Sequence, residues 1–129
     1  MTLAAALRQH WASSPGLAAL LPTERLFTGQ AVDPQRPYAV MHGFEGTQQG
    51  HFGDGSKLES IAVELCIHDD DFARLQQITA AARAAFDGAA LSLTSSSRVL
   101  AIEVSNGGQT QDDRGHWRAT LTLACHVLG

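Results

Sequence analysis

The chain has 129 residues and a formal net charge of −4, and 44% of its residues are apolar and 17% charged. This length and ordinary composition predict one globular domain spanning residues 1–129. Eight arginines and a single lysine, Lys57, do not give the basic excess of a nucleic-acid-binding surface. The apolar runs are too short to cross a bilayer, and the first residues lack the pattern of a signal peptide. We therefore expect a cytoplasmic origin and no membrane contact.

The N-terminal part predicts helices and one short strand. Thr2 is suited to cap a first helix that carries Leu3, Leu7 and Trp11 on one side. The Ser-Ser-Pro-Gly segment at 13–16 should end this helix, and its proline suits the first turn of a further short helix through residue 21. Residues 25–28 then predict a short strand.

Two strands and a long connection are expected between residues 38 and 68. Residues 38–44 alternate, so one face should carry Tyr38, Val40, His42 and Phe44. Residues 57–68 alternate strictly, with Ile61, Val63, Leu65 and Ile67 on the buried face and Ala62, Glu64 and Cys66 on the other. Residues 45–56, between these strands, hold four of the 12 glycines and predict a long mobile loop.

A long helix is expected over residues 72–86. Its apolar stripe consists of Phe72, Leu75, Ile78, Ala82, Ala85 and Phe86. The aspartates at 69–71 can cap its first turn and complement the helix dipole, and Asp87-Gly88 supplies its end.

The last third of the chain predicts two more strands. Residues 89–97 form a connection with room for a little strand. Residues 98–105 alternate, with Leu100, Ile102 and Val104 on one side. Residues 105–115 are polar and glycine-bearing and predict a second mobile loop. Residues 116–128 alternate again and place Trp117, Ala119, Leu121, Leu123, Cys125 and Val127 on one side.

These elements predict an α+β fold: a largely antiparallel sheet of about five strands, with the long helix and the N-terminal helix on one face. The expected core joins the helix stripe to the strands, through Phe72, Leu75, Ile78, Ala82, Phe86, Ile61, Val63, Leu65, Leu100, Ile102, Leu121 and Leu123. The opposite sheet face is small and polar, with Ala62, Glu64, Thr120 and Thr122, and should be solvated or covered by another subunit.

Sequence motifs for chemistry are weak. Residues 53–57 contain glycines and a lysine, but they precede a strand and lack the Gly-Lys-Ser/Thr of a phosphate-binding loop. His68 and the three aspartates after it have no metal-loop spacing, so helix capping explains them better. The six histidines follow no metal-binding spacing, and no Gly-x-Ser-x-Gly motif occurs. We expect no catalytic, cofactor-binding or metal-binding residues.

Cys66 and Cys125 are the two cysteines of the chain. The alternation places Cys66 on the polar face of its strand and Cys125 in register with Leu121 and Leu123. The two side chains should point to opposite faces, so we expect no disulfide.

The order of these segments resembles the tail-completion or tail-terminator proteins of long-tailed, siphovirus-like bacteriophages and prophages. The matching features are Arg25-Leu26-Phe27, then Pro37-Tyr38-Ala39-Val40, then a glycine-bearing loop before the long strand at 58–68. A helix at 73–86 and the approach Arg114-Gly115-His116-Trp117-Arg118 to the last strand complete the likeness, which covers nearly the whole chain.

The resemblance implies a single tail-terminator-like domain and a structural, non-enzymatic role without a cofactor. Such proteins form rings, commonly hexamers, that cap the tail tube, end its polymerisation and provide the surface for the head connector. DNA would pass through the ring without specific binding. The protein would be found at the tail–head junction of the virion, and in the host cytoplasm during assembly.

Head-to-tail contacts in a ring require two different patches on each subunit. The two predicted loops and the open sheet face are the candidates, and the interface residues expected from the loops are Gln48, Gln49, His51, Phe52, Asp54, Gln109, Gln111, Asp112, Asp113 and Arg114. Two alternatives stay open: another head–tail connector or neck component, or a ligand-binding or enzymatic α+β domain.

Overall fold

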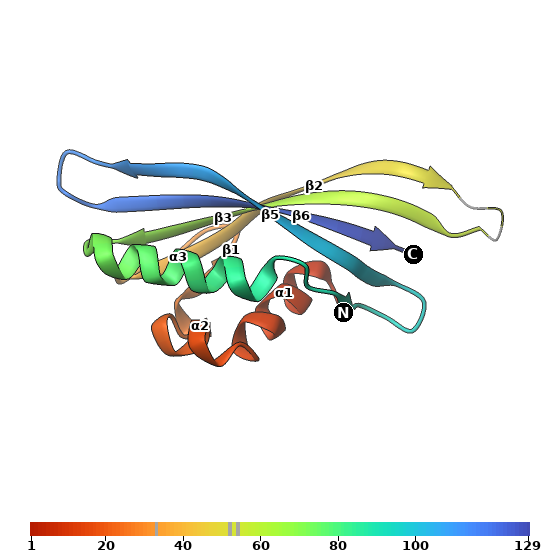
Figure 1. The fold of residues 1–129 in the computed structure, drawn as a ribbon, viewed down its shortest axis with the longest axis horizontal. Coiled ribbons are helices and arrows are strands. Elements are labelled where there is room, and N and C mark those ends of the chain that lie inside the picture. Colours follow the sequence, from red (N-terminus) through yellow and green to blue (C-terminus); the bar gives the residue numbers. More distant parts are fainter. Residues whose placement is uncertain (33, 52, 54) are drawn as a thin grey trace.

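The computed structural model describes residues 1–32, 34–51, 53 and 55–129, and for Gln48, Gln49 and His51 it describes the backbone alone. Within these residues six strands form one sheet in the order β1-β2-β3-β6-β5-β4. The helices lie together on one face of this strongly twisted sheet (Figure 1). The α+β class and the one-sided helix layer predicted from the sequence are therefore confirmed, whereas the sheet has six strands within the described residues and not about five. None of the helices in the described part of the chain is long and apolar enough to span a bilayer.

The helices are α1 (Leu3–Ala12), α2 (Pro15–Leu20) and α3 (Phe72–Phe86), with a short 3-10 turn, η1 (Thr23–Arg25), after α2. The strands are β1 (Leu26–Thr28), β2 (Tyr38–His51), β3 (Lys57–Asp69), β4 (Leu91–Ser92), β5 (Arg98–Gln111) and β6 (Trp117–Leu128). Strand β1 runs parallel to β2, and every other described pair is antiparallel.

The helix ends follow the predicted capping. The Thr2 hydroxyl oxygen accepts a hydrogen bond from the Ala5 amide, and Asp71 accepts one from the Arg74 amide, so each satisfies a free donor of a first helical turn. Pro15 occupies the first turn of α2. Gly88 has a φ of 79° just after α3, where a side chain would be strained.

The core lies between α3 and the middle of β3 and β6. The predicted helix positions Leu75, Ile78, Ala82 and Phe86 are buried, as are Val63, Leu65, Leu121 and Leu123 of the two central strands. The Trp11 indole is fully buried beside Phe86, and its N–H donates to the Leu21 carbonyl oxygen at 2.8 Å. This bond fixes α1 against α2 and satisfies a polar group that would be costly to bury alone.

Three predicted core positions differ from expectation. Leu100 is 40% exposed. The register of β5 against β6 shifts between Val99 and Ala101, so this β-bulge turns Leu100 outward and leaves Val99 and Ile102 buried. Phe72 and Ile61 are only partly buried; Phe72 packs on Trp117 with ring centroids 4.5 Å apart.

Both predicted loops are largely strand. Strand β2 continues to His51 and β5 continues to Gln111, so most of 45–56 and 105–115 belongs to the sheet. The register shifts between His42 and Glu45, Gln48 and Gly50, and Asn106 and Gly108, so Gly43, Gly50, Gly107 and Gly108 accompany β-bulges. Residues 105–111 are exposed throughout. They carry no alternating apolar pattern, because no core lies beneath them.

The core assignment can be tested with three alanine substitutions. Leu75→Ala and Leu121→Ala should each lower the free energy of unfolding by about 2–5 kcal/mol, since both remove buried methyl groups. Leu100→Ala is the matched control and should cost less than about 1 kcal/mol, because the bulge already exposes this leucine. Denaturant unfolding measures all three. Equal losses at all three positions would contradict the bulged register.

Candidate functional site

Two hairpins project from opposite ends of the sheet. We call residues 45–51 with 57–61 the β2–β3 arm, and residues 105–120 the β5–β6 arm. Along the β3–β6 ladder, Leu58 pairs with Leu128 at one end and Asp69 with Trp117 at the other. Figure 1 shows the two arms extending in opposite directions; the β2–β3 arm extends well beyond the helices, whereas α3 runs alongside the β5–β6 arm nearly to its turn. Each subunit therefore carries two different projecting surfaces.

The predicted interface residues divide between these arms. Gln48, Gln49 and His51 belong to β2, and Phe52 and Asp54 lie outside the described residues. Gln109 and Gln111 are exposed on β5, and Asp112, Asp113 and Arg114 form the exposed turn that follows. The structure thus groups the described members at two distant ends rather than in one patch.

The turn of the β5–β6 arm is organised by Asp112. One carboxylate oxygen accepts from the Arg114 and His116 amides, both at 2.9 Å, and the other lies 3.2 Å from His116 Nδ1. The hydrogen bond from the His116 backbone is the main reason that the pKa of Asp112 lies below its usual value. Asp112 is therefore an internal support of the turn as well as a predicted contact residue.

A charged cluster lies at the turn end of this arm, because Asp69 pairs with Trp117 and Trp117 pairs with Gln111, next to the turn. Asp69, fully buried at the end of β3, accepts two hydrogen bonds of 2.7 Å from the Arg74 guanidinium and one from the Asp71 amide. Burial alone would raise the pKa of Asp69, but these hydrogen bonds outweigh it and hold the pKa below its ordinary value. Asp70 lies within 3.5 Å of both Arg36 and His116.

Beside this cluster lies a cavity of about 470 Å³ with a cationic wall. Its charged and titratable lining includes Arg36, His68, Asp112, His116 and Arg118. His68 stacks on Tyr38 at 4.5 Å. Its own burial and then the charges of Arg118 and Arg36 lower the pKa of His68, so it is neutral at pH 7.

The face opposite the helices is polar and mostly acidic at its centre. Glu64 and Glu103 are exposed there, and each lies within 3.6 Å of a histidine, His42 and His126 respectively. Glu45 joins His42 and Glu64 around a cavity of about 220 Å³. The predicted small polar face, with Ala62, Thr120 and Thr122, is thus confirmed.

The predicted opposite orientation of the cysteines is also observed. Both are free thiols; Cys125 lies in the core, and Cys66 faces the histidine of the polar face. Burial raises the pKa of the Cys125 thiol to about 11, so this group stays protonated at neutral pH.

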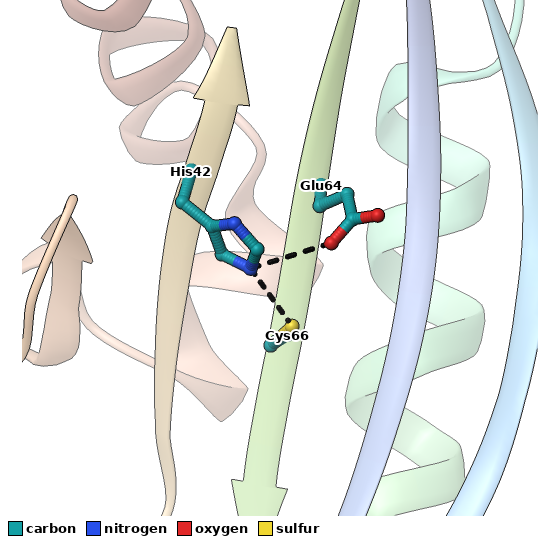
Figure 2. Close-up of side chains that lie close together, drawn as sticks. All are labelled: His42, Glu64 and Cys66. Carbon is teal, nitrogen blue, oxygen red and sulfur yellow. Dashed lines mark hydrogen bonds and ion pairs between the residues drawn. The ribbon is translucent and has the colours of Figure 1, made fainter.

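Figure 2 shows a cluster on this face that the sequence did not reveal: His42, Glu64 and Cys66. His42 Nε2 lies 3.5 Å from Glu64 Oε2 and 3.4 Å from Cys66 Sγ. The alternation of β3 already placed Glu64 and Cys66 on one face. The missing information was the register, which pairs His42 of β2 directly with Glu64.

Strand edges are a further candidate surface. Among the described residues, β1 pairs only with positions 39–41 of β2, and β4 pairs only with Arg98 and Val99 of β5. The end of α3 covers the middle of β5, where Gly88 donates to the Ile102 carbonyl oxygen and Asp87 accepts from the Val104 amide. No described strand flanks the outer edges of residues 42–51 and 105–111, so these edges can receive another strand.

These features define a class of protein: a small α+β subunit whose arms, strand edges and open sheet face are suited to assembly. The chain belongs to the family of the tail completion protein gp17, whose model matches residues 5–127. Among solved structures it is similar to a chain of the virion of a native gene transfer agent particle. That match has a TM-score of 0.77 and 19% identity, and it covers 98% of this chain and 95% of the other. A search of curated proteins gives no match.

Family membership makes this chain a structural tail protein of a bacteriophage virion, as the resemblance in its sequence indicated. The solved structure supports the same fold in a phage-like particle.

Loss of the buried charge of Asp69 should destabilise the fold at the turn end of the β5–β6 arm. Asp69→Asn should lower the free energy of unfolding by about 2–4 kcal/mol, less than for a fully buried pair because Arg74 is partly exposed. Since the folded-state pKa is depressed, this contribution is present above the unfolded-state pKa of about 3.9 and is lost as pH falls through the folded-state pKa.

Urea unfolding at neutral pH and in acid measures this contribution. Asp113→Asn, on an exposed side chain of the nearby turn, is the control and should change stability little. A difference between Asp69→Asn and the parent protein that stays constant down to strongly acidic pH would contradict the assignment.

Proposed function

We propose that this protein forms a ring of six subunits, each a single 1–129 domain, which caps the tail tube, ends its polymerisation and presents the head-joining surface. The observation that carries the proposal is the tail completion family match over residues 5–127. Its partners would be further copies of the chain, the tail tube protein and a head connector or neck protein. The role requires no catalysis, so the proposal includes no enzymatic activity.

The two arms support a head-to-tail ring. A cyclic assembly joins one patch of a subunit to a different patch of the next. The open edge of β2 begins at position 42 and the open edge of β5 begins at position 105. These two edges lie on opposite sides of the sheet, and each is nearer to a different end of the strands. Strand directions alternate from β2 through β3 and β6 to β5, so β2 and β5 run in opposite directions.

A β2 edge of one subunit would therefore meet the β5 edge of the next in antiparallel pairing, the more common sheet geometry. Because the open edges lie toward opposite ends, each contact shifts one subunit along the strand direction, as stagger does in a closed barrel. The arms would overlap between neighbours. This arrangement uses the predicted contact residues Gln48, Gln49, Gln109 and Gln111, and it places the turn at 112–114 near the next subunit.

Two adjacent proline substitutions test the edge contact. Gln109 and Thr110 are consecutive on β5, so their amide N–H groups point to opposite edges, one toward β6 and one outward. Proline at the outward position should abolish oligomers while the subunit stays folded, because only the edge donor is lost. Proline at the other position should weaken the fold itself. Light scattering and circular dichroism measure both; an oligomer that survives the outward proline would contradict edge pairing.

Loss of the gene distinguishes a tail terminator from another neck component. Without a terminator, tubes should grow beyond their normal length and remain unattached to heads. Without a connector of another kind, tails of normal length should accumulate beside separate heads. Electron microscopy of the mutant lysate measures tail length and head attachment, and complementation by the intact gene is the control. Normal, head-joined tails in the mutant would contradict both roles.

The ring should let DNA pass without holding it. The net charge is −4, and the centre of the open face carries Glu45, Glu64 and Glu103, so a channel built from this face repels phosphate. We expect no measurable binding of double-stranded DNA near physiological salt in an anisotropy titration. Tight binding that weakens steeply with added salt would count against the conduit.

A further inference from the structure

The cluster of His42, Glu64 and Cys66 contains three metal-ligand types: an imidazole nitrogen, a carboxylate oxygen and a thiol sulfur. One ligand atom from each lies within 4.8 Å of the other two. The side chains converge from two neighbouring strands, with His42 on β2 and the other two on β3 (Figure 2). These side chains lie on the open sheet face, whereas the proposed ring contacts use the backbone edges of the arms; His42 is the first residue of the open β2 edge.

Two of the three ligand separations match a tetrahedral zinc site. Zinc binds nitrogen and oxygen at about 2.0–2.2 Å and sulfur at about 2.3 Å, so two ligands at the tetrahedral angle lie about 3.3–3.7 Å apart. The measured separations from His42 Nε2 are 3.5 Å to Glu64 Oε2 and 3.4 Å to Cys66 Sγ. The ligand atoms of Glu64 and Cys66 lie within 4.8 Å of each other, and rotation of the exposed Glu64 side chain can bring its carboxylate to an ion held by the other two.

The donor set also selects the kind of ion. Calcium and magnesium prefer oxygen ligands alone, whereas zinc accepts thiolate, imidazole and carboxylate together. Cys66 is buried, and its sulfur lies 3.8 Å from the Thr120 hydroxyl oxygen, which can orient a thiolate as a neighbouring donor. His42 and Glu64 are 41% and 52% exposed as side chains, so an ion can enter from solvent.

A fourth ligand position is open. The cavity of about 220 Å³ beside His42 and Glu64 is also lined by Glu45 and Thr122. A water molecule can occupy this position, as in zinc sites with three protein ligands. The negative charges of Glu64 and Glu45 favour a dication there.

We propose that His42, Glu64 and Cys66 bind one Zn²⁺ ion on the open sheet face, with water as the fourth ligand. The thiol proton of Cys66 passes to solvent when the ion binds. The ion connects β2 to β3 at the last regular pair before the bulge at Gly43 and Phe44. Zinc therefore stabilises the base of the β2–β3 arm.

The test uses the untagged full chain after removal of metal with a chelator. Zn²⁺ alone is titrated calorimetrically, and Co²⁺ is used as a spectroscopic substitute, because a cobalt–thiolate bond gives a charge-transfer absorption band. We expect one equivalent of metal, the cobalt–thiolate band and a higher melting temperature with zinc. Absence of saturable binding, or saturable cobalt binding without the band, would overturn the proposal.

Three variants assign the ligands. Cys66→Ser should abolish the cobalt–thiolate band, and Glu64→Gln, on an exposed side chain, should weaken zinc binding by more than about tenfold. His126→Ala is the matched control: it removes a histidine that lies 3.6 Å from Glu103 on the same face. It should retain the band, the stoichiometry and the affinity.

If Cys66→Ser does not fold, the zinc affinities of Glu64→Gln, His126→Ala and the parent chain are sufficient to test the site. Equal zinc affinities of Glu64→Gln and the parent chain would overturn the site, as would loss of binding in His126→Ala. Retention of the band in a folded Cys66→Ser protein would show that Cys125 holds the metal and would also overturn it.

Discussion

The rise per residue is much smaller in a helix than in a strand, and this difference determines the shape of this molecule. Strand β2 has 14 residues and α3 has 15, yet an extended strand of that length spans about 46 Å and the helix only about 22 Å. The helices therefore cover only part of the length of the sheet: α3 begins beside the Asp69–Trp117 end, where Phe72 packs on Trp117, and the β2–β3 arm extends past the helices (Figure 1). The strand ends must extend beyond the core as arms, and their backbone hydrogen bonds to each other hold them together without a buried apolar face.

The boundary between core and arm requires its own stabilisation. At one end, Asp69 is buried at the last position of β3, beside the turn end of the β5–β6 arm, and Arg74 from the first turn of α3 holds it there. Toward the other end, the bulge at Gly43 and Phe44 turns the Phe44 ring back toward the core. The two boundaries therefore differ. The buried ion pair fixes β3 to the helix layer, whereas the bulge changes which side chains of β2 are buried.

The sequence was informative wherever one face of an element is covered. The alternation of β3 and the stripe of α3 correctly indicated the core, and the residue types at Thr2 and Asp71 indicated the helix caps. Alternation also indicated the opposite orientation of the two cysteines. The sequence was misleading where the local structure depends on contacts between strands that are distant in the chain. A single inserted residue reversed the face of Leu100, and strands without a covered face resembled loops because neither side of them is apolar.

The candidate sites show the same limit. Glu64 and Cys66 could be placed on one face from period alone, but the contribution of His42 depends on the register between strands. Likewise, the polar residues of the two expected loops could be recognised as surface residues. Their separation to opposite ends of one sheet follows from the strand order, which no local pattern contains.

The position of the chain ends gives the molecule a usable polarity. The Met1 amino group donates to the Leu93 carbonyl oxygen, and Gly129 exchanges backbone hydrogen bonds with Lys57 at the start of β3. Both termini lie toward the end of the sheet that carries the β2–β3 arm, away from the β5–β6 arm (Figure 1). A small fluorescent or electron-dense tag on either terminus would therefore mark one end of the subunit, and in images of labelled particles it would report which arm is directed toward the head.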